Sequence, residues 1–212
     1  MVQCRLTAIL TVLTDGQTLQ PQPQPGQRGL GQSVDVFRTA HRGWGVRART
    51  QIEAGQFVCT YSGEILGQAE CSARYLKNDA EKNDNYIIAL REHTTTPPAA
   101  TGAAAAEAAS VPAAPAGSVP TTTFIDAGAH GNVGRYINHS CDPNLVILLT
   151  RSDYPVPVAA LYAAETIAAG AELTFSYGEC PTSPLPRGVR ECLCGAGSCT
   201  GYLPFDAALG CT

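Results

Sequence analysis

The chain has 212 residues, of which 44% are hydrophobic and 15% charged, and its formal net charge is −4. This length and composition fit one globular domain of ordinary size with extensions. A protein that grips nucleic acid usually carries a basic surface, so the acidic balance favours a basic peptide partner over direct nucleic-acid binding. No run of about 18 apolar residues is present, so we expect no transmembrane helix and no membrane partner.

Residues 1–33 predict a leader or linker. The stretch QPQPQPGQRGLG at 20–31 is rich in Pro, Gly and Gln, which is typical of a linker. The apolar stretch LTAILTVL at 6–13 is short for a signal-peptide core and lacks a small-x-small cleavage site. We therefore expect the folded domain to begin at 34 and to continue to 178.

Short runs rich in β-branched and aromatic residues then predict strands separated by tight turns. They are VDVF at 34–37, WGVRA at 44–48, FVCTYSGEIL at 57–66, NYIIAL at 85–90, LVILLT at 145–150, VAALYAAETI at 158–167 and AELTFSY at 171–177. Alanine and leucine at helical spacing predict a helix over 68–82, and a short helix is expected over 133–138. Strands and helices do not alternate regularly, so we predict a mainly β domain.

Residues 94–120 predict a disordered, low-complexity insertion in a surface loop. Alanine favours helix there, but five prolines oppose it. The entropy of closing a loop grows slowly with its length, so an insertion of this kind is tolerated. The flanking segments 87–93 and 122–127 are therefore expected to pair as a hairpin.

The nine cysteines are unevenly spread, because Cys192, Cys194 and Cys199 fall within the eight residues CLCGAGSC. An odd total with one tight cluster argues against a disulfide framework and for a metal site in a reducing compartment. Tetrahedral zinc needs a fourth ligand. The spacing leaves it open among Cys141, Cys180, Cys211 and His139. Residues 179–191 are expected to be a connector, and 192–212 the zinc segment.

Three further constellations could carry chemistry. Two glycines flank Trp44 in RGWG, and they would let the backbone approach a ligand closely. In NHSCDPN, His139 could be a general base, a metal ligand or a buried structural residue. Tyr61 in YSGE and Tyr177 in FSYG could be half-buried core residues or could reach an active site.

Taken together and in order, these segments resemble the SET-domain family of protein lysine methyltransferases. The matching segments are RGWGVRA, YSGE, DNYII, GNVGRYINHSCDPN, ELTFSYG and CLCGAGSC, and the resemblance covers about residues 34–211. It implies a β-clip fold of small sheets and a zinc-bound post-SET tail. It also implies that the C-terminal segment threads beneath a preceding loop like a pseudoknot, an exception to the usual rule.

The resemblance further implies a role for each matching position. The cofactor S-adenosylmethionine would be bound by Arg42, Gly43, Trp44, Tyr86, Arg135, Asn138, His139 and Leu203. Tyr177 would be the catalytic tyrosine, and Tyr61 and Phe175 would line the lysine channel. The Zn²⁺ ligands would be Cys141, Cys192, Cys194 and Cys199. A phenylalanine at 175 tends to allow di- or trimethylation in related enzymes.

The implied function is methyl transfer to a lysine side chain of a histone tail, most closely that of histone H3, in the nucleus and on chromosomes. Close relatives carry a cysteine-rich pre-SET region, whereas only Cys4 precedes residue 34 here, so that region is expected to be degenerate or missing. The alternatives are an impaired SET domain acting as a chromatin-binding scaffold, a methyltransferase for a non-histone protein, and a zinc module that binds nucleic acid.

Overall fold

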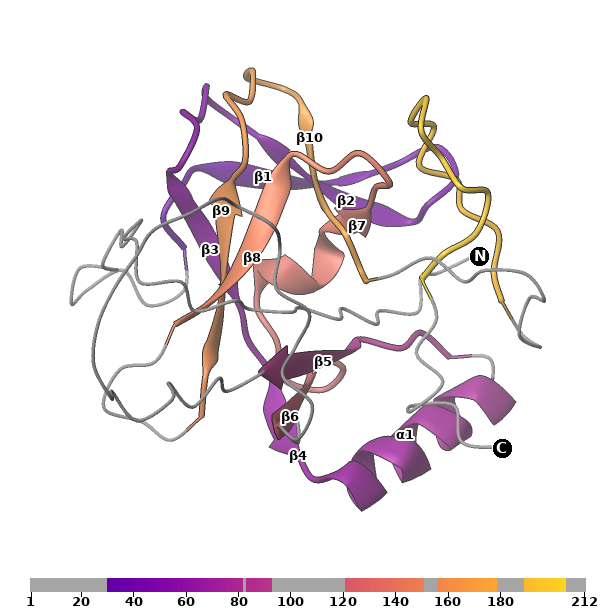
Figure 1. The fold of residues 1–212 in the computed structure, drawn as a ribbon. Coiled ribbons are helices and arrows are strands. Elements are labelled where there is room, and N and C mark those ends of the chain that lie inside the picture. The colour runs from indigo at the N-terminus through magenta and orange to yellow at the C-terminus, as the bar shows by residue number, and fades with distance from the viewer. Residues whose placement is uncertain (1–29, 82, 93–120, 151–155, 179–188, 205–212) are drawn as a thin grey trace, which may run out of the picture.

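The computed structural model describes residues 30–81, 83–92, 121–150, 156–178 and 189–204. Within these ranges the chain is mainly β, as predicted. A large curled sheet lies above a small sheet that is flanked by one helix, and the C-terminal segment 189–204 lies to one side (Figure 1). No helix in the described part of the chain is long and apolar enough to cross a membrane.

The large sheet supplies most of the core. Its strand order is β1 (Val34–Arg38), β2 (Trp44–Ala48), β10 (Glu172–Phe175), β8 (Leu145–Thr150), β9 (Val158–Ala163) and β3 (Phe57–Tyr61), with β7 (Asn138–His139) paired to β10. Isoleucine, leucine and valine side chains from these strands and their turns are removed from water. Val46, Ile52, Val58, Leu161 and Leu173 are each 0% exposed. Burial of this apolar surface is the main force that stabilises the sheet.

The small sheet has the order β4 (Glu64–Leu66), β6 (Thr121–Asp126) and β5 (Ile87–Glu92). Its β5–β6 pairing confirms the predicted hairpin, with Glu92 opposite Thr121. The predicted strand over 57–66 is instead two strands that belong to different sheets. The break falls at Gly63, where a Cβ would lie 2.3 Å from the carbonyl oxygen of Asp126, so only glycine fits.

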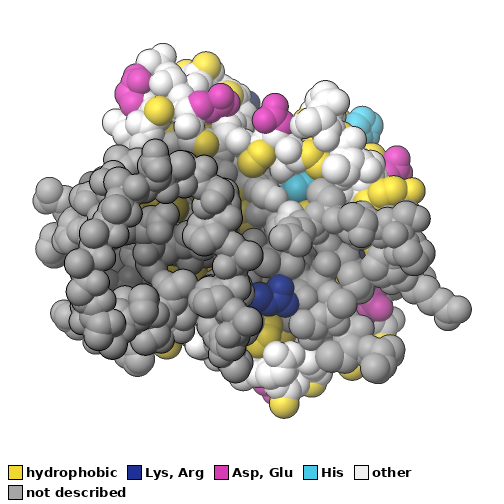
Figure 2. All heavy atoms as spheres, in the orientation of Figure 1, with side chains coloured by type: hydrophobic (Ala, Val, Ile, Leu, Met, Phe, Trp, Pro, Cys, Tyr) yellow, Lys and Arg dark blue, Asp and Glu magenta, His cyan; other side chains and the backbone are white. Residues whose placement is uncertain are grey.

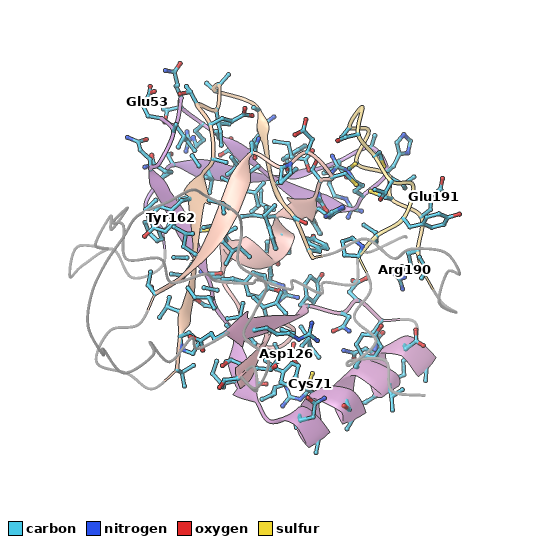
Figure 3. All side chains as sticks on the ribbon, viewed as in Figure 1. Glu53, Cys71, Asp126, Tyr162, Arg190 and Glu191 are labelled. Atoms are coloured by element: carbon cyan, nitrogen blue, oxygen red, sulfur yellow. The ribbon has the colours of Figure 1, made fainter. Side chains whose placement is uncertain are left out.

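The helix α1 (Gln68–Ala80) ends two residues before the predicted limit. It buries Cys71 and Tyr75 against the small sheet, and Figure 3 shows Cys71 on α1 and Asp126 on β6 in this region. Arg74 anchors the contact. Its guanidinium binds Glu64, and Glu70 and Asp126 each at 2.8 Å. These hydrogen bonds raise the pKa of Arg74, and the bond to Glu64 has the largest effect.

One local prediction needs correction. The helix expected over 133–138 is one 3₁₀ turn, η1 (Val133–Tyr136), because Ile137 is extended and Asn138 already belongs to β7. The leader expected through residue 33 includes residues that pack on the sheet, since Gly31 N–H donates to Val58 O at 2.7 Å. Residues 1–29 and the whole of the predicted insertion at 94–120 lie outside the described residues.

The strand β10 provides the predicted threading. It pairs antiparallel with β2 and parallel with β7 and β8, and Phe175 lies between His139 of β7 and Leu145 of β8. Asn144 fixes the crossing, because its side chain donates to Glu172 O at 2.8 Å and accepts from Thr174 N–H at 2.9 Å. The segment 172–177 therefore lies against the 138–144 loop.

Replacing Leu161 by alanine tests the core of the large sheet. Leu161 is 0% exposed and lies between β3 and β8. The lost burial and the remaining cavity should lower the free energy of unfolding by about 2–5 kcal/mol. Val158→Ala on the same strand removes a side chain that is 39% exposed, and it should cost about 0.5 kcal/mol or less. Urea unfolding of both variants measures the difference, and equal costs would contradict this assignment of the core.

Candidate functional site

Three aromatic side chains predicted to form the lysine channel lie together. Tyr61 ends β3, Phe175 ends β10, and Tyr177 follows two residues later. The Tyr61 and Phe175 ring centroids are 6.5 Å apart, and those of Phe175 and Tyr177 are 4.9 Å apart. Each side chain is at most 2% exposed. The crossing of β10 therefore brings residues more than a hundred positions apart into one buried cluster.

The two tyrosine hydroxyls of this cluster are fixed by backbone carbonyls. Tyr177 OH donates to Ile137 O at 2.8 Å, and Tyr61 OH donates to Tyr86 O at 2.7 Å. Burial raises the pKa of Tyr61 well above its usual value, although the charge of Arg135 opposes this. Tyr61 is therefore protonated at neutral pH. A phenol oxygen that donates its proton can still accept a hydrogen bond, so each hydroxyl can orient a polar group in the cluster.

A carboxylate joins two of the predicted cofactor segments. Glu172 binds the Arg42 guanidinium at 2.6 Å and accepts from Asn138 Nδ2 at 2.9 Å. Asn138 Nδ2 also donates to Trp44 O at 2.9 Å, and Arg42 donates to His139 O at 3.4 Å. The fold thus brings Arg42, Trp44, Asn138 and His139 together.

Glu172 was not predicted as a site residue, because its partners lie 34 and 130 residues away. An acidic residue in ELTF facing an arginine in RGWG is the signal that could have identified it. Gly43, between Arg42 and Trp44, has a φ of 74°, which a residue with a side chain rarely adopts.

Tyr86 and Arg135 form a second group. The Arg135 guanidinium carbon lies 4.1 Å from the centre of the Tyr86 ring, and its Nη1 donates to Gly128 O at 2.9 Å. Arg135 Nε is buried and has no hydrogen-bond partner among the described residues. Since Tyr86 O accepts from Tyr61, this group adjoins the aromatic cluster.

The C-terminal segment approaches this second group. Burial raises the pKa of Asp84, and the positive charge of Arg190 opposes that rise, so the two side chains lie within electrostatic reach. Leu203 is buried, and its N–H donates to Arg190 O at 2.9 Å. Figure 3 labels Arg190 and Glu191 at the start of this segment. Leu203 is thus held beside Arg190, and its role as a cover of the cofactor stays a prediction.

A cavity of about 640 Å³ lies between α1 and the start of β5. It is lined by Glu70, Ala73, Arg74, Lys77, Asn78, Asn83, Asp84, Tyr86, Asp126, Gly128 and Ala129. Tyr86 is the one predicted cofactor residue among these. The sequence did not predict the cavity, because its walls come from three separate segments.

Four cysteine sulfurs lie together, one from the loop that follows β7 and three from the C-terminal segment. Those of Cys141, Cys192, Cys194 and Cys199 all lie within 4.8 Å of one another. Cys141 Sγ is 3.9 Å from Cys192 Sγ and 4.0 Å from Cys199 Sγ. A tetrahedron with zinc–sulfur bonds of about 2.3 Å has sulfurs about 3.8 Å apart. The geometry therefore fits a four-cysteine zinc site, with Cys141 as fourth member. Cys180 and Cys211 lie outside the described residues.

The chemistry of one of these thiols, that of Cys194, also suits a metal. Burial raises the pKa of Cys194, but hydrogen bonds from backbone groups of Cys141 and Ala196 and from the neighbouring thiols lower it to about 6. A thiolate is the form that binds a metal, and Cys194 already has that form near neutral pH.

His139 lies between the cysteines and the aromatic cluster. It is 2% exposed, and burial together with the charge of Arg42 lowers its pKa to about 4, against a hydrogen bond with the Phe175 backbone that raises it. The imidazole is therefore neutral at physiological pH. Its Nδ1 accepts from Tyr177 N–H at 3.2 Å, and its Nε2 lies 3.4 Å from Cys141 Sγ. With both nitrogens engaged, His139 is poorly placed to act as a general base.

On the face drawn in Figure 2, the described side chains show acidic and hydrophobic groups and little lysine or arginine. That part of the surface offers no broad basic patch of the kind that binds a phosphate backbone.

Comparison with known proteins places this geometry in a family. The model of the SET domain matches residues 43–178. The rat protein named histone-lysine N-methyltransferase SETMAR is 38% identical over 193 residues, which cover 86% of this chain and 54% of that protein. The chain thus spans about half the length of this relative.

Two solved structures are also similar. The crystal structure of the methyltransferase domain of human SETMAR matches with a TM-score of 0.64 at 34% identity, over 84% of this chain and 60% of that one. A crystal structure of KRYPTONITE in complex with mCHG DNA and SAH matches with a TM-score of 0.56 at 29% identity, over 82% of this chain and 30% of that one. The match to the SET model over 43–178, the β10 crossing and the buried tyrosines agree, and the chain belongs to the SET-domain family.

Proposed function

We propose that this protein is a lysine N-methyltransferase that transfers a methyl group from S-adenosylmethionine to a histone tail, that of histone H3. The observation that carries the proposal is the buried cluster of Tyr61, Phe175 and Tyr177 beside the network of Arg42, Asn138 and Glu172. The relatives named histone-lysine N-methyltransferases support the substrate class, and also a place in the nucleus on chromosomes.

S-adenosylmethionine supplies a methyl group on a positively charged sulfonium, which makes that carbon open to attack by an amine. The residues proposed to hold this cofactor are Arg42, Gly43, Trp44, Tyr86, Arg135, Asn138, His139 and Leu203. Glu172 holds the side chains of Arg42 and Asn138 in place relative to each other, because it binds both. Trp44, 42% exposed, offers a flat ring on which an aromatic group of the cofactor can stack. Arg135 Nε, which has no hydrogen-bond partner among the described residues, would be a donor to the cofactor's polar groups.

The aromatic cluster would prepare the lysine for attack. A free lysine has a pKa of about 10.4, so its amine is charged and is not a nucleophile at neutral pH. Burial between Tyr61 and Phe175 disfavours the charged form. Tyr177, whose proton is donated to Ile137 O, presents its oxygen to accept from the amine and align it for in-line transfer. Tyr177 is an orienting group here and not a strong base, because a phenol has a pKa near 10.

The four-cysteine site is proposed to hold one Zn²⁺, which would join the C-terminal segment to the end of β7 through Cys141. We further propose that the SET domain covers 34–178 with an insertion at 94–120, that 179–191 is a connector, and that 192–212 is the zinc segment. Residues 1–33 would be a leader or linker, of which Gly31 contacts Val58 of β3.

Replacing Tyr177 by phenylalanine tests the proposed function. The wild-type chain should transfer label from S-adenosylmethionine to core histones. Tyr177→Phe should lower kcat by about a hundredfold or more, because the oxygen that aligns the amine is lost. Cofactor binding, followed by calorimetry, should change little, and the chain should stay folded, although the unfolding midpoint should fall because Ile137 O loses its hydrogen bond. Full turnover in Tyr177→Phe would remove that residue from the mechanism. Cofactor binding by a wild-type chain that transfers no label would favour a scaffold function.

The number of methyl groups added tests the role of Phe175. A phenylalanine leaves more room beside the amine than a tyrosine, whose hydroxyl can hold a water, so a methylated amine can rotate and react again. We expect at least dimethyl-lysine when the modified histone peptides are analysed by mass spectrometry. Phe175→Tyr should shift the product towards monomethyl-lysine. Monomethyl product alone from the wild-type chain would contradict this role.

Removal of zinc tests the role of the cysteine site. A chelator should free the C-terminal segment, because the metal would join Cys141 to three cysteines of that segment. Proteolysis within 189–204 should become faster, and the affinity for S-adenosylmethionine should fall. Chelator loaded beforehand with zinc is the control. Unchanged cofactor affinity after complete metal loss, measured by elemental analysis, would contradict the proposed coupling.

A further inference from the structure

His139 makes one contact with each of two centres that the sequence keeps apart. Its Nδ1 faces the backbone N–H of Tyr177, and its Nε2 faces the sulfur of Cys141. It is 2% exposed, so water does not compete for either nitrogen. The two rings are also close, with the centroids of His139 and Tyr177 5.3 Å apart.

The backbone determines which nitrogen carries the proton. The N–H of Tyr177 can only donate, so Nδ1, at 3.2 Å, must accept and must be unprotonated. A neutral imidazole then carries its proton on Nε2, which lies 3.4 Å from Cys141 Sγ. The Phe175 carbonyl also lies near the ring and, with two lone pairs, can accept from the ring as well as from Ser140 N–H at 3.2 Å, so the Tyr177 N–H, which cannot accept, is the group that decides the tautomer. The ring is thus arranged to donate to sulfur and accept from Tyr177.

We propose that His139 is a positioning residue that links the cysteine site to Tyr177, donating Nε2–H to the Cys141 sulfur and accepting the Tyr177 N–H at Nδ1. The effect of this link on catalysis rests on the proposed function. Loading of the cysteine site would help to hold Tyr177 in place, through one rigid ring. A hydrogen bond to a ligating atom changes metal affinity by about 10–100-fold in other proteins.

Two substitutions separate the halves of the link. Asparagine places an amide oxygen near the position of Nδ1, so His139→Asn keeps the acceptor for Tyr177 and loses the donor to sulfur. Glutamine places an amide NH₂ near the position of Nε2, so His139→Gln keeps the donor and loses the acceptor. His130→Asn is the matched control, because His130 is 80% exposed and contacts Glu64 at the small sheet.

Two measurements on the full chain should rank these variants in opposite orders. Zinc release to a chelating dye should be about tenfold faster in His139→Asn than in His139→Gln. Exchange of the Tyr177 amide proton, followed by NMR, should be at least tenfold faster in His139→Gln than in His139→Asn. At saturating zinc and cofactor, kcat should be lower in His139→Gln than in His139→Asn, the same ranking as for the Tyr177 amide exchange. The His130→Asn control should match the wild type in all three.

The same order in both measurements, or wild-type values in both variants, would overturn the link. So would a purified chain that holds no zinc. If neither variant folds, ¹⁵N shifts of the wild-type imidazole still decide, because a proton found on Nδ1 contradicts the link. Zinc release, amide exchange and the imidazole shifts need no methyl transfer. An inactive wild-type chain that still shows the opposite orders would reject the proposed function and keep the link.

Discussion

The pairing of β10 with β7 is the constraint on which the site depends. Two residue pairs, Thr174 with Asn138 and Phe175 with His139, hold these strands in parallel. This contact places Glu172 on Asn138 at one end and Tyr177 on His139 at the other. Parallel neighbours need long connections, and closing a long loop costs entropy before its contacts form. The buried side chains of β10 and the Asn144 hydrogen bonds offset that cost.

Much of the fold follows from local patterns in the sequence. Runs such as LVILLT and VDVF are strands, since β-branched and large apolar side chains pack well on a half-buried pleated surface. The 3₁₀ turn at Val133–Tyr136 was overestimated as a longer helix, because local spacing does not show that Asn138 is needed to pair with β10. Likewise, Gly63 gave no sign of a sheet boundary, since its close neighbour is the distant Asp126.

For the site, too, local spacing predicted some residues, whereas others depend on contacts between distant parts of the chain. Residue spacing predicted three cysteines of a metal site and left the fourth open, and the fold brings Cys141 to them. Glu172 and the carbonyl of Ile137 were not predicted, because a carboxylate or carbonyl acquires its role only from what the fold sets opposite it. The resemblance to a family indicated candidate site residues, and the fold shows which residues each of them contacts.

The register of the β5–β6 hairpin has a consequence for engineering. Glu92 and Thr121 are paired, so the two ends of the described hairpin lie opposite each other at the edge of the small sheet. Tyr86 precedes the opposite end of β5, about 20 Å away for six strand residues. A reporter domain or affinity tag could replace residues 93–120 without altering the strand pairing beside Tyr86. Each doubling of the loop would cost about 0.6 kcal/mol. The hairpin thus makes this chain a suitable host for insertions that leave Tyr86 in place.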